Sequence, residues 1–389
     1  MNDSVLIIPK PRGALDFGIL VLIVKTVLSM SSMWHSSAWL DNILTAVSVV
    51  LLVSSILSKK YSMKQLLTYA VITILFGIIC INIGSTGLLI TVMTCLAIRD
   101  EDMERIIRFI FKYEFWIVAI HCLAGAIGTL LGEHYYVIYR GYRRYSLGFG
   151  HANVLSAFVF NLIIMFFWLR FEKIKSKDFA LAVIAEFLVY RVARTRTSLY
   201  LLVVVIVLVL FYKNKTYSKL INFLAKYTIP VLSLFTLVMF YLYEKGNVLS
   251  HFVDNLLTHR IALASYAYNR LGLSLFGRDM RDFTMTWDEY YGFSGSFTFD
   301  NIYSYLMINV GIVILFFVIL VFYKVAKQGN LKNNIFILIW ALYSMTEVHG
   351  LSCYMCFPIL MAALVIPGVY RSEKRTGYQK SNIVKPLSD

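Results

Sequence analysis

The stretch that decides the fold is TSLYLLVVVIVLVLFY, residues 197 to 212, which contains no charged side chain. Its length is close to the roughly twenty apolar residues that an α-helix needs to cross a bilayer. Two arginines stand just before it, in RTR at 194 to 196, and two lysines just after it, in KNK at 213 to 215. The stretch therefore predicts a membrane-spanning helix with arginine at one end and lysine at the other.

Apolar stretches of this kind recur along the whole chain. Of the 389 residues, 59% are hydrophobic and 15% are charged, and the mean hydropathy is +0.70, which is far more apolar than a soluble protein. We expect an all-α, polytopic membrane helix bundle with about twelve spans, forming a single transmembrane domain over residues 1 to 389. The first apolar run lacks a small-residue cleavage site, so its helix is expected to be retained. The expected spans are 14–31, 41–58, 66–82, 84–99, 113–132, 152–171, 179–193, 197–212, 227–244, 302–323, 334–350 and 354–370.

Basic residues orient the expected bundle. If the N-terminal tail with Lys10 and Arg12 is cytoplasmic, every second connection is cytoplasmic too, and each of these is rich in Lys or Arg, as the positive-inside rule requires. Both termini, including the tail at 371 to 389, are then expected in the cytoplasm. The outer side carries two longer connections, an outer loop at 133 to 151 and a large loop at 245 to 300.

The net charge of +15 does not indicate nucleic-acid binding, because the basic residues are not interleaved with aromatics that stack on bases. The five cysteines lie in or beside apolar stretches, where packing is their expected role. No spacing of Asp, Glu, His or Cys in the sequence demands a metal ion, and no P-loop or dinucleotide motif occurs. The sequence therefore carries no motif that points to a cofactor.

The type of cation differs between the two sides of the expected bundle. The cytoplasmic side has eighteen Lys and seven Arg, whereas the outer side has one Lys and ten Arg. A topological signal does not distinguish Lys from Arg, but bidentate recognition of phosphate or carboxylate does. We expect an anionic ligand on the outer face; anchoring to lipid headgroups or pairing with outer acids is the alternative. The outer arginines are Arg140, Arg143, Arg144, Arg191, Arg194, Arg196, Arg260, Arg270, Arg278 and Arg281.

The large outer loop is too polar to cross a membrane and too rich in aromatic residues to be disordered. We expect it to fold over the membrane face. Helical periodicity over 254 to 271 predicts one amphipathic helix, whose polar face meets a sugar, a phosphate or simply water. The apolar face holds Leu257, Ile261, Ala264, Tyr268 and Leu271, and the polar face holds Asn255, His259, Tyr266 and Arg270, with Arg260 on the flank.

One stretch, YRGYRRYSLGFGHANVLSAFVFN at 139 to 161, resembles an outer segment of the Wzy-type polysaccharide polymerases, relatives of the O-antigen ligases. Members often read R, S, G, F and then H-P-N. The matching residues here are Arg144, Ser146, Gly148, Phe149, His151 and Asn153, with Ala152 in place of the proline. Three more stretches follow in the family's order: RTRTSLY at 194 to 200, HRIALASYAYNRLGLSLFG at 259 to 277 and DNIYSYLMINVG at 300 to 311.

The resemblance, which covers roughly residues 139 to 350, implies a GT-C-like membrane glycosyltransferase of the bacterial plasma membrane. Such an enzyme polymerises undecaprenyl-pyrophosphate-linked oligosaccharides at the outer leaflet, by moving the growing glycan to the non-reducing end of a new lipid-linked unit. Oriented guanidinium groups would stabilise the negative charge on the departing pyrophosphate. The implied partners are these lipid-linked oligosaccharides, membrane lipids, and a chain-length regulator and a flippase.

Site residues follow from the outer charges and the resemblance together. The acceptor hydroxyl also needs a proton acceptor, for which His151, His251 and His349 are further candidates. Helix capping by His151 and Asn153 and a salt bridge at Glu347 are the structural alternatives. Lys25 and Glu186 lie near mid-span, where charges are functional or paired, and a pair between them is one possibility. Expected catalytic residues are Arg194, Arg196, Arg260, His259, Glu347 and Asp300; expected substrate-binding residues are Arg140, Arg143, Arg144, His151, Asn153, Tyr266, Arg270 and Arg278.

Other functions compete with polymerisation. An O-antigen-ligase-like transferase would give the glycan to a different acceptor. A flippase for lipid-linked oligosaccharides, or another transporter, would also have about twelve helices, but transporters tend to carry internal repeats, and the sequence shows none. A non-catalytic scaffold leaves the grouped outer arginines without a role.

Overall fold

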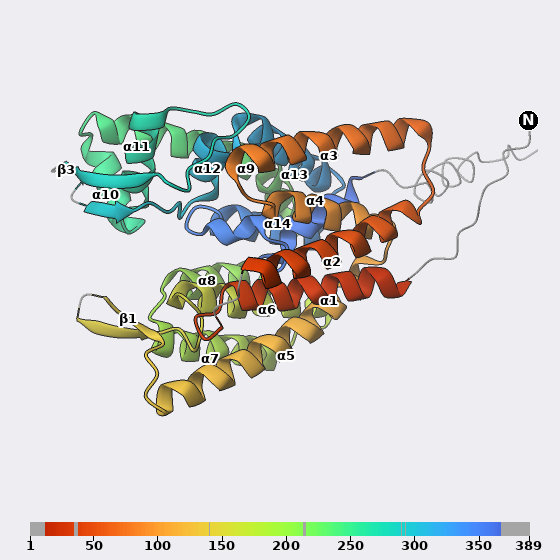
Figure 1. Cartoon of the computed structure of the whole chain (residues 1–389), viewed down its shortest axis with the longest axis horizontal. Helices are drawn as coiled ribbons and strands as arrows, with labels where there is room; N and C mark the ends of the chain where they lie inside the picture. Colours follow the sequence, from red (N-terminus) through yellow and green to blue (C-terminus); the bar gives the residue numbers. More distant parts are fainter. Residues whose placement is uncertain are drawn as a thin grey trace, which may run out of the picture.

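The computed structural model describes residues 12–34, 38–139, 141–212, 215–288, 290–291 and 293–366. Arg140, the tail at 371 to 389 and the end of the last expected span lie outside these residues. The described chain is mostly helical (Figure 1), as the sequence predicts, with two short antiparallel hairpins.

Most of the bundle consists of longer helices. They are α1 (Arg12–Ser29), α2 (Ala38–Leu57), α3 (Met63–Ile83), α4 (Gly87–Ile98), α5 (Met103–Leu130), α6 (Ala152–Arg170), α7 (Ser176–Ala193), α8 (Thr197–Leu210), α9 (Lys215–Glu244), α10 (Val248–Leu256), α11 (Arg260–Leu271), α13 (Ile312–Lys327) and α14 (Leu331–Tyr343). The short helical turns are η1 (Phe171–Lys173), α12 (Ile302–Tyr305), η2 (Leu306–Val310), η3 (Val348–Leu351) and η4 (Phe357–Leu364). The hairpins pair β1 (Tyr136–Tyr139) with β2 (Tyr142–Tyr145), and β3 (Thr284–Asp288) with β4 (Phe293–Ser296).

Five helical stretches in the described part of the chain are long and apolar enough to cross a bilayer. They are α2, α3, α5, α9 from Thr216 onward, and Ala152–Lys173, which comprises α6 and η1. Large apolar side chains on these helices face outward: Val50 is 67% exposed, Ile74 61% and Leu234 62%. Such a surface suits lipid rather than water. The protein is therefore a helical membrane protein, while the number of about twelve spans and their orientation stay predictions.

The central helix of the bundle is α6. Of its apolar stretch, 78% is buried, and it packs against α5, α7, α8 and α14. Asn161 in its middle joins three segments: its amide nitrogen donates to Glu114 Oε1 of α5 at 2.9 Å, and its amide oxygen accepts from the Phe357 backbone nitrogen of η4 at 2.8 Å. Buried polar groups require such partners, so these bonds fix α6 within the bundle.

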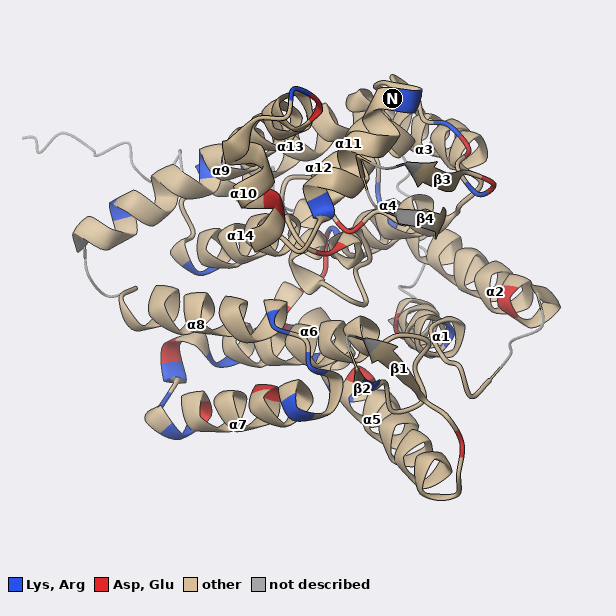
Figure 2. Ribbon diagram, turned by 90° about the vertical axis from the view of Figure 1, so that its left-hand side faces the viewer, with Lys and Arg blue, Asp and Glu red and all other residues tan. Residues whose placement is uncertain are grey.

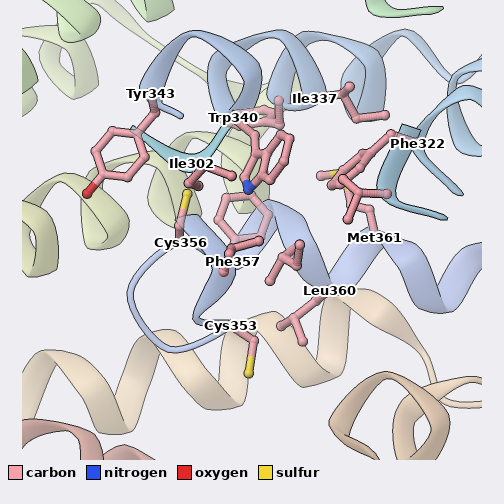
Figure 3. Close-up of a cluster of buried hydrophobic side chains, with 14 of the residues drawn as sticks. Ile302, Phe322, Ile337, Trp340, Tyr343, Cys353, Cys356, Phe357, Leu360 and Met361 are labelled. Carbon is pink, nitrogen blue, oxygen red and sulfur yellow. The ribbon is translucent and has the colours of Figure 1, made fainter. Parts of the chain in front are cut away.

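The C-terminal segments form a dense apolar cluster, shown in Figure 3. Trp340 of α14 stacks on Phe322 of α13 with 4.5 Å between ring centroids, and its indole nitrogen donates to the Gly350 carbonyl at 2.8 Å. Cys353 and Cys356 lie in the same cluster as buried free thiols. Their surroundings agree with the packing role expected for the cysteines.

Three expected spans differ from uninterrupted α-helices. In place of one helix over 302 to 323, the chain forms α12, the π-helical turn η2 and α13, because the carbonyls of Met307 and Asn309 accept the backbone N–H groups of Ser274 and Arg278 at 2.9 and 2.8 Å. The large loop thus donates hydrogen bonds to carbonyl groups that would otherwise accept hydrogen bonds within a regular helix. The expected span at 334 to 350 ends with α14 at Tyr343, and the last expected span contains the 3₁₀ helix η4.

Both hairpins lie with α10 and α11 at one end of the bundle, which we call the hairpin end (Figures 1 and 2). The large loop is folded there, as expected, but the single helix predicted over 254 to 271 is wrong. Thr258 and His259 adopt left-handed conformations, with φ of 56° and 66°, and separate α10 from α11. The break places Arg260 and Tyr266 in the interior, whereas the projection of one continuous helix left them on its flank and polar face.

A glycine contact in α5 tests how tightly the 146 to 149 turn is held. A Cβ at Gly125 would lie 2.2 Å from the Leu147 carbonyl oxygen. Because this oxygen belongs to the backbone, no side-chain rotation can relieve the clash. We expect Gly125→Ala to lower stability by about 1–3 kcal/mol, measured as a lower thermal unfolding midpoint in detergent. Gly77→Ala in α3, where a Cβ meets nothing within 4 Å, is the matched control. Equal losses in both variants would contradict the packing argument.

Candidate functional site

Polar side chains from five separate segments converge at the hairpin end. The segments are β2, the start of α6, the start of α11, the turn before α12 and the connection after α14. Figure 2 looks onto this end, with acidic and basic segments near its centre. All the converging residues are among those expected from the sequence, and we call them the Arg260 cluster: Arg144, His151, Asn153, Arg260, Asp300 and Glu347.

Arg260 carries a nearly buried guanidinium group in this cluster. Its side chain is 9% exposed, Nη2 lies 3.4 Å from Glu347 Oε1, and Nε lies 3.9 Å from Asp300 Oδ2. Nη1 donates to Thr258 Oγ1 at 2.9 Å. Both carboxylate contacts are long for charge-assisted hydrogen bonds, and Nε has no hydrogen-bond partner within the described residues. The guanidinium group is thus held in place but keeps donor capacity for an anion.

The break between α10 and α11 aims Arg260. Buried Asp254 stabilises this break: its Oδ1 accepts from the Ala262 backbone nitrogen in the first turn of α11 at 2.8 Å, and its Oδ2 lies 3.1 Å from His259 Nδ1. Left-handed residues other than glycine cost of order 1 kcal/mol or more, and these bonds offset that cost. His259, expected as catalytic, here serves as a partner of Asp254 at the start of α11.

The two carboxyl groups next to Arg260 have shifted proton affinities. Burial raises the pKa of Glu347 to about 8, although Arg260 lowers it. Burial likewise raises the pKa of Asp300, against the opposing effects of Arg260 and His151. A carboxyl group whose pKa is close to the working pH can both accept and release a proton. Glu347 therefore has the property that a general base at this site requires.

The other half of the cluster is built by β2 and α6. Arg144 Nε donates to the Ala193 carbonyl at the end of α7 at 3.0 Å, and its Nη2 donates to Asn153 Oδ1 at 2.7 Å. The backbone nitrogen of Asn153 donates to His151 Nδ1 at 3.1 Å, so His151 does cap α6. Burial and then Arg144 lower the pKa of His151, while Asp300 raises it. His151 therefore lies where both halves of the cluster act on it.

A small polar cavity joins the two halves. Asn153 and Glu347 line it together with Thr195, Ser198 and Tyr343, and it has room for about one water molecule. The hydroxyls of Thr195 and Tyr343 are buried and have no hydrogen-bond partner within the part of the chain described. Buried polar groups of this kind usually bind an internal water or a ligand.

Arg194 and Arg196 stand at the rim of the site. Both are exposed in the turn between α7 and α8, directly after Ala193, whose carbonyl binds Arg144. The Arg194 guanidinium group lies 4.7 Å from the Tyr142 ring centroid. Both arginines therefore lie at the surface beside the buried cluster.

Two expected binding residues lie apart from the Arg260 cluster for local reasons. Arg143 points to the opposite face of β2 from Arg144, since side chains alternate along a strand, and its guanidinium group lies 5.0 Å from the Tyr136 ring. Arg278 donates to the carbonyls of Leu271 and Leu273 and thereby closes a turn.

Tyr266 and Arg270 also lie apart from it. Tyr266 is buried, and its hydroxyl accepts from the Thr286 backbone nitrogen at 3.0 Å. Arg270 is ten residues after Arg260 along α11, roughly 15 Å away, and its guanidinium group lies 3.7 Å from the Tyr266 ring centroid. The hydrogen bond between Tyr266 and Thr286 joins the β3–β4 hairpin to α11.

The two deep charges do not pair with each other. Lys25 lies one turn before the end of α1 and contacts Asp41 Oδ2 of the neighbouring α2 at 3.4 Å. Glu186 of α7 is fully buried, and its carboxyl group interacts with the Ser198 side chain at the start of α8. The pair considered from the sequence is therefore wrong, because α2 supplies the carboxylate that Lys25 reaches.

Three residues of the site were not expected from the sequence. Asp254 supports the start of α11, a role whose only signal is an acid placed before a helix start. Thr195 and Tyr343 line the small cavity. In the sequence Thr195 lies between two arginines and Tyr343 lies in an apolar stretch, and neither position distinguishes a site residue from an ordinary core residue.

No group of three or more His, Cys, Asp or Glu residues in the described chain is arranged to hold a metal ion. Comparison of the chain with family models, curated proteins and solved structures gives no match. The functional assignment therefore depends on the geometry of the Arg260 cluster and on the resemblance of individual motifs.

Proposed function

We propose that the protein is a Wzy-type, GT-C-like glycosyltransferase that polymerises undecaprenyl-pyrophosphate-linked oligosaccharide repeat units, with the hairpin end facing outward. The observation that carries this proposal is the Arg260 guanidinium group, buried beside Glu347 and Asp300 with donor capacity to spare. The motif resemblance supports it, because Arg144, His151 and Asn153 belong to the same cluster. A chain-length regulator and a flippase are proposed partners.

In the proposed reaction, an acceptor hydroxyl oxygen forms a bond to the anomeric carbon of the donor glycan. The bond from that carbon to the pyrophosphate oxygen breaks, and its electron pair leaves with the pyrophosphate. The hydroxyl proton passes to Glu347, whose raised pKa of about 8 suits a proton acceptor. Arg260 stabilises the charge that develops on the pyrophosphate, and it does so best in a site from which water is excluded.

The buried and the exposed arginines are proposed to have different roles in binding the substrate. Arg260 and Arg144 are held by fixed contacts, so their orientation is set before the substrate arrives. Arg194 and Arg196 are exposed and would close on the pyrophosphate or the glycan from the rim. Preorganised donors cost little reorganisation during the reaction, which is why they favour the transition state.

The alternatives use the same anion site differently. A ligase-like transferase would accept the same donor but pass the glycan to another acceptor, and a flippase would move the lipid-linked substrate without breaking a glycosidic bond. The deciding experiment supplies the purified protein with lipid-pyrophosphate-linked repeat units. We expect a ladder of longer glycans; movement of labelled substrate across a vesicle membrane with no ladder would reject the proposal.

Arg260→Lys tests the guanidinium geometry. An ammonium group cannot contact Thr258 and Glu347 and still present paired donors to a pyrophosphate, so we expect the initial rate of ladder formation to fall about 10²–10³-fold. Arg270→Lys, on the same helix but outside the cluster, is the matched control and should keep the rate close to wild type. An Arg260→Lys variant with the wild-type rate would show that guanidinium geometry is not required.

Glu347 predicts a particular dependence on pH. Below its pKa of about 8 the carboxyl group is protonated and cannot accept a proton, so the elongation rate should rise as the pH rises through this value. Arg260, Asp300 and Arg144 face the same group. Glu347→Gln should give a low rate without this rise, measured across the same pH range. A wild-type rate that is flat through the pKa would rule out Glu347 as the base.

A further inference from the structure

A hollow of about 240 Å³, lined by apolar residues and several polar ones, lies next to the Arg260 cluster and shares none of its residues. Its walls come from α1, α4 and the segment at 348 to 355. His349 in one wall interacts electrostatically with His151, so the hollow adjoins the proposed reaction site. The polar side chains that matter here are Lys25, Thr26, Ser29, Ser85, Tyr305 and His349.

The hollow has a cationic side chain in its wall. Lys25 lines it, and none of the described residues that line it is Asp or Glu. The Lys25 side chain is 16% exposed, and its contact with Asp41 Oδ2 at 3.4 Å uses one of the three donors of an ammonium group. A cation so placed is suited to a ligand with a negative charge.

The hydroxyl groups around Lys25 offer both hydrogen-bond acceptors and donors. Thr26 Oγ1 donates to the Leu22 carbonyl at 2.7 Å and Ser29 Oγ to the Thr26 carbonyl at 3.1 Å, so both oxygens present lone pairs to the hollow. Ser85 Oγ already accepts from the Gly87 backbone nitrogen, which leaves its O–H to donate. Mixed donors and acceptors beside an aromatic ring such as Tyr305 suit a sugar.

We propose that this hollow binds a saccharide that carries a carboxylate, with the carboxylate on Lys25 and the ring hydroxyls on Thr26, Ser29 and Ser85. The proposal rests on the proposed function, because it places an acidic sugar of the acceptor repeat unit beside His349 and the Arg260 cluster. A neutral sugar would leave the partly buried ammonium group of Lys25 with Asp41 as its single charged partner among the described residues.

Thermal unfolding of the full chain in nanodiscs tests the inference with glucuronate as the probe, since a ligand that binds the folded state raises the midpoint. We expect glucuronate to raise the midpoint and glucose at the same concentration to have a much smaller effect. Lys25→Met should weaken glucuronate binding at least about tenfold, the loss expected for a charge-assisted hydrogen bond. An equal effect of glucose, or of inorganic phosphate, would overturn the proposal.

Asp41→Asn separates binding from the salt bridge. If Lys25 serves only to pair with Asp41, Asp41→Asn and Lys25→Met should change the protein alike; we expect Asp41→Asn to retain glucuronate binding. Should Lys25→Met not fold, the double variant Lys25→Met with Asp41→Asn leaves no unpaired carboxylate and should fold without binding glucuronate. Binding that survives in the double variant would overturn the proposal.

The two proposals can fail separately. Ladder formation by wild-type protein that does not bind glucuronate would leave the polymerase in place and remove the acidic-sugar site. Glucuronate binding that depends on Lys25, in a protein that forms no ladder, would keep the binding site and remove the polymerase.

Discussion

A guanidinium charge removed from water is the constraint on which the hairpin end depends. A buried arginine without partners costs several kcal/mol, and Arg260 meets Glu347 and Asp300 instead. Bringing these groups together requires irregular backbone: α10 and α11 separate at Thr258 and His259, and α14 stops at Tyr343 so that the chain can turn Glu347 toward the centre. Each of these backbone breaks is stabilised by its own local hydrogen bonds, and together they bring Arg260 and its carboxylate partners into contact.

The same constraint links the two halves of the site. The central helix α6 is fixed by Asn161 within the bundle, and its first turn carries Asn153, which orients Arg144. The large loop, in contrast, lies outside the bundle and delivers Arg260. Between them lies a cavity whose hydroxyls have spare hydrogen-bonding capacity. The site therefore combines one half fixed within the bundle with another half supplied by the large loop.

The sequence predicted which types of residue gather at the hairpin end better than it predicted which of them lie in the interior. Arg144 and Arg260, two of the arginines expected on the outer side, do lie in the Arg260 cluster, and the motif around Arg144 supplies one half of that cluster. Which arginines enter the interior depends on features without a sequence signal. Two left-handed residues break the expected helix and bury Arg260, while strand alternation turns Arg143 away from Arg144. Helical projection placed Tyr266 on the polar face, where it could bind a ligand. In the structure its hydroxyl group accepts a hydrogen bond from the Thr286 backbone nitrogen.

The separation of Arg260 and Glu347 by 87 positions in the chain also sets an order of assembly. During synthesis Arg144 and its partners emerge first, the large loop follows, and the carboxylate that meets Arg260 comes last. A chain cut short before residue 347 would hold every proposed anion-binding arginine yet leave Arg260 without its nearest carboxylate. In such a product Asp300 would be the carboxylate left beside Arg260, with its Oδ2 3.9 Å from Arg260 Nε, so the interior charge would be only partly compensated.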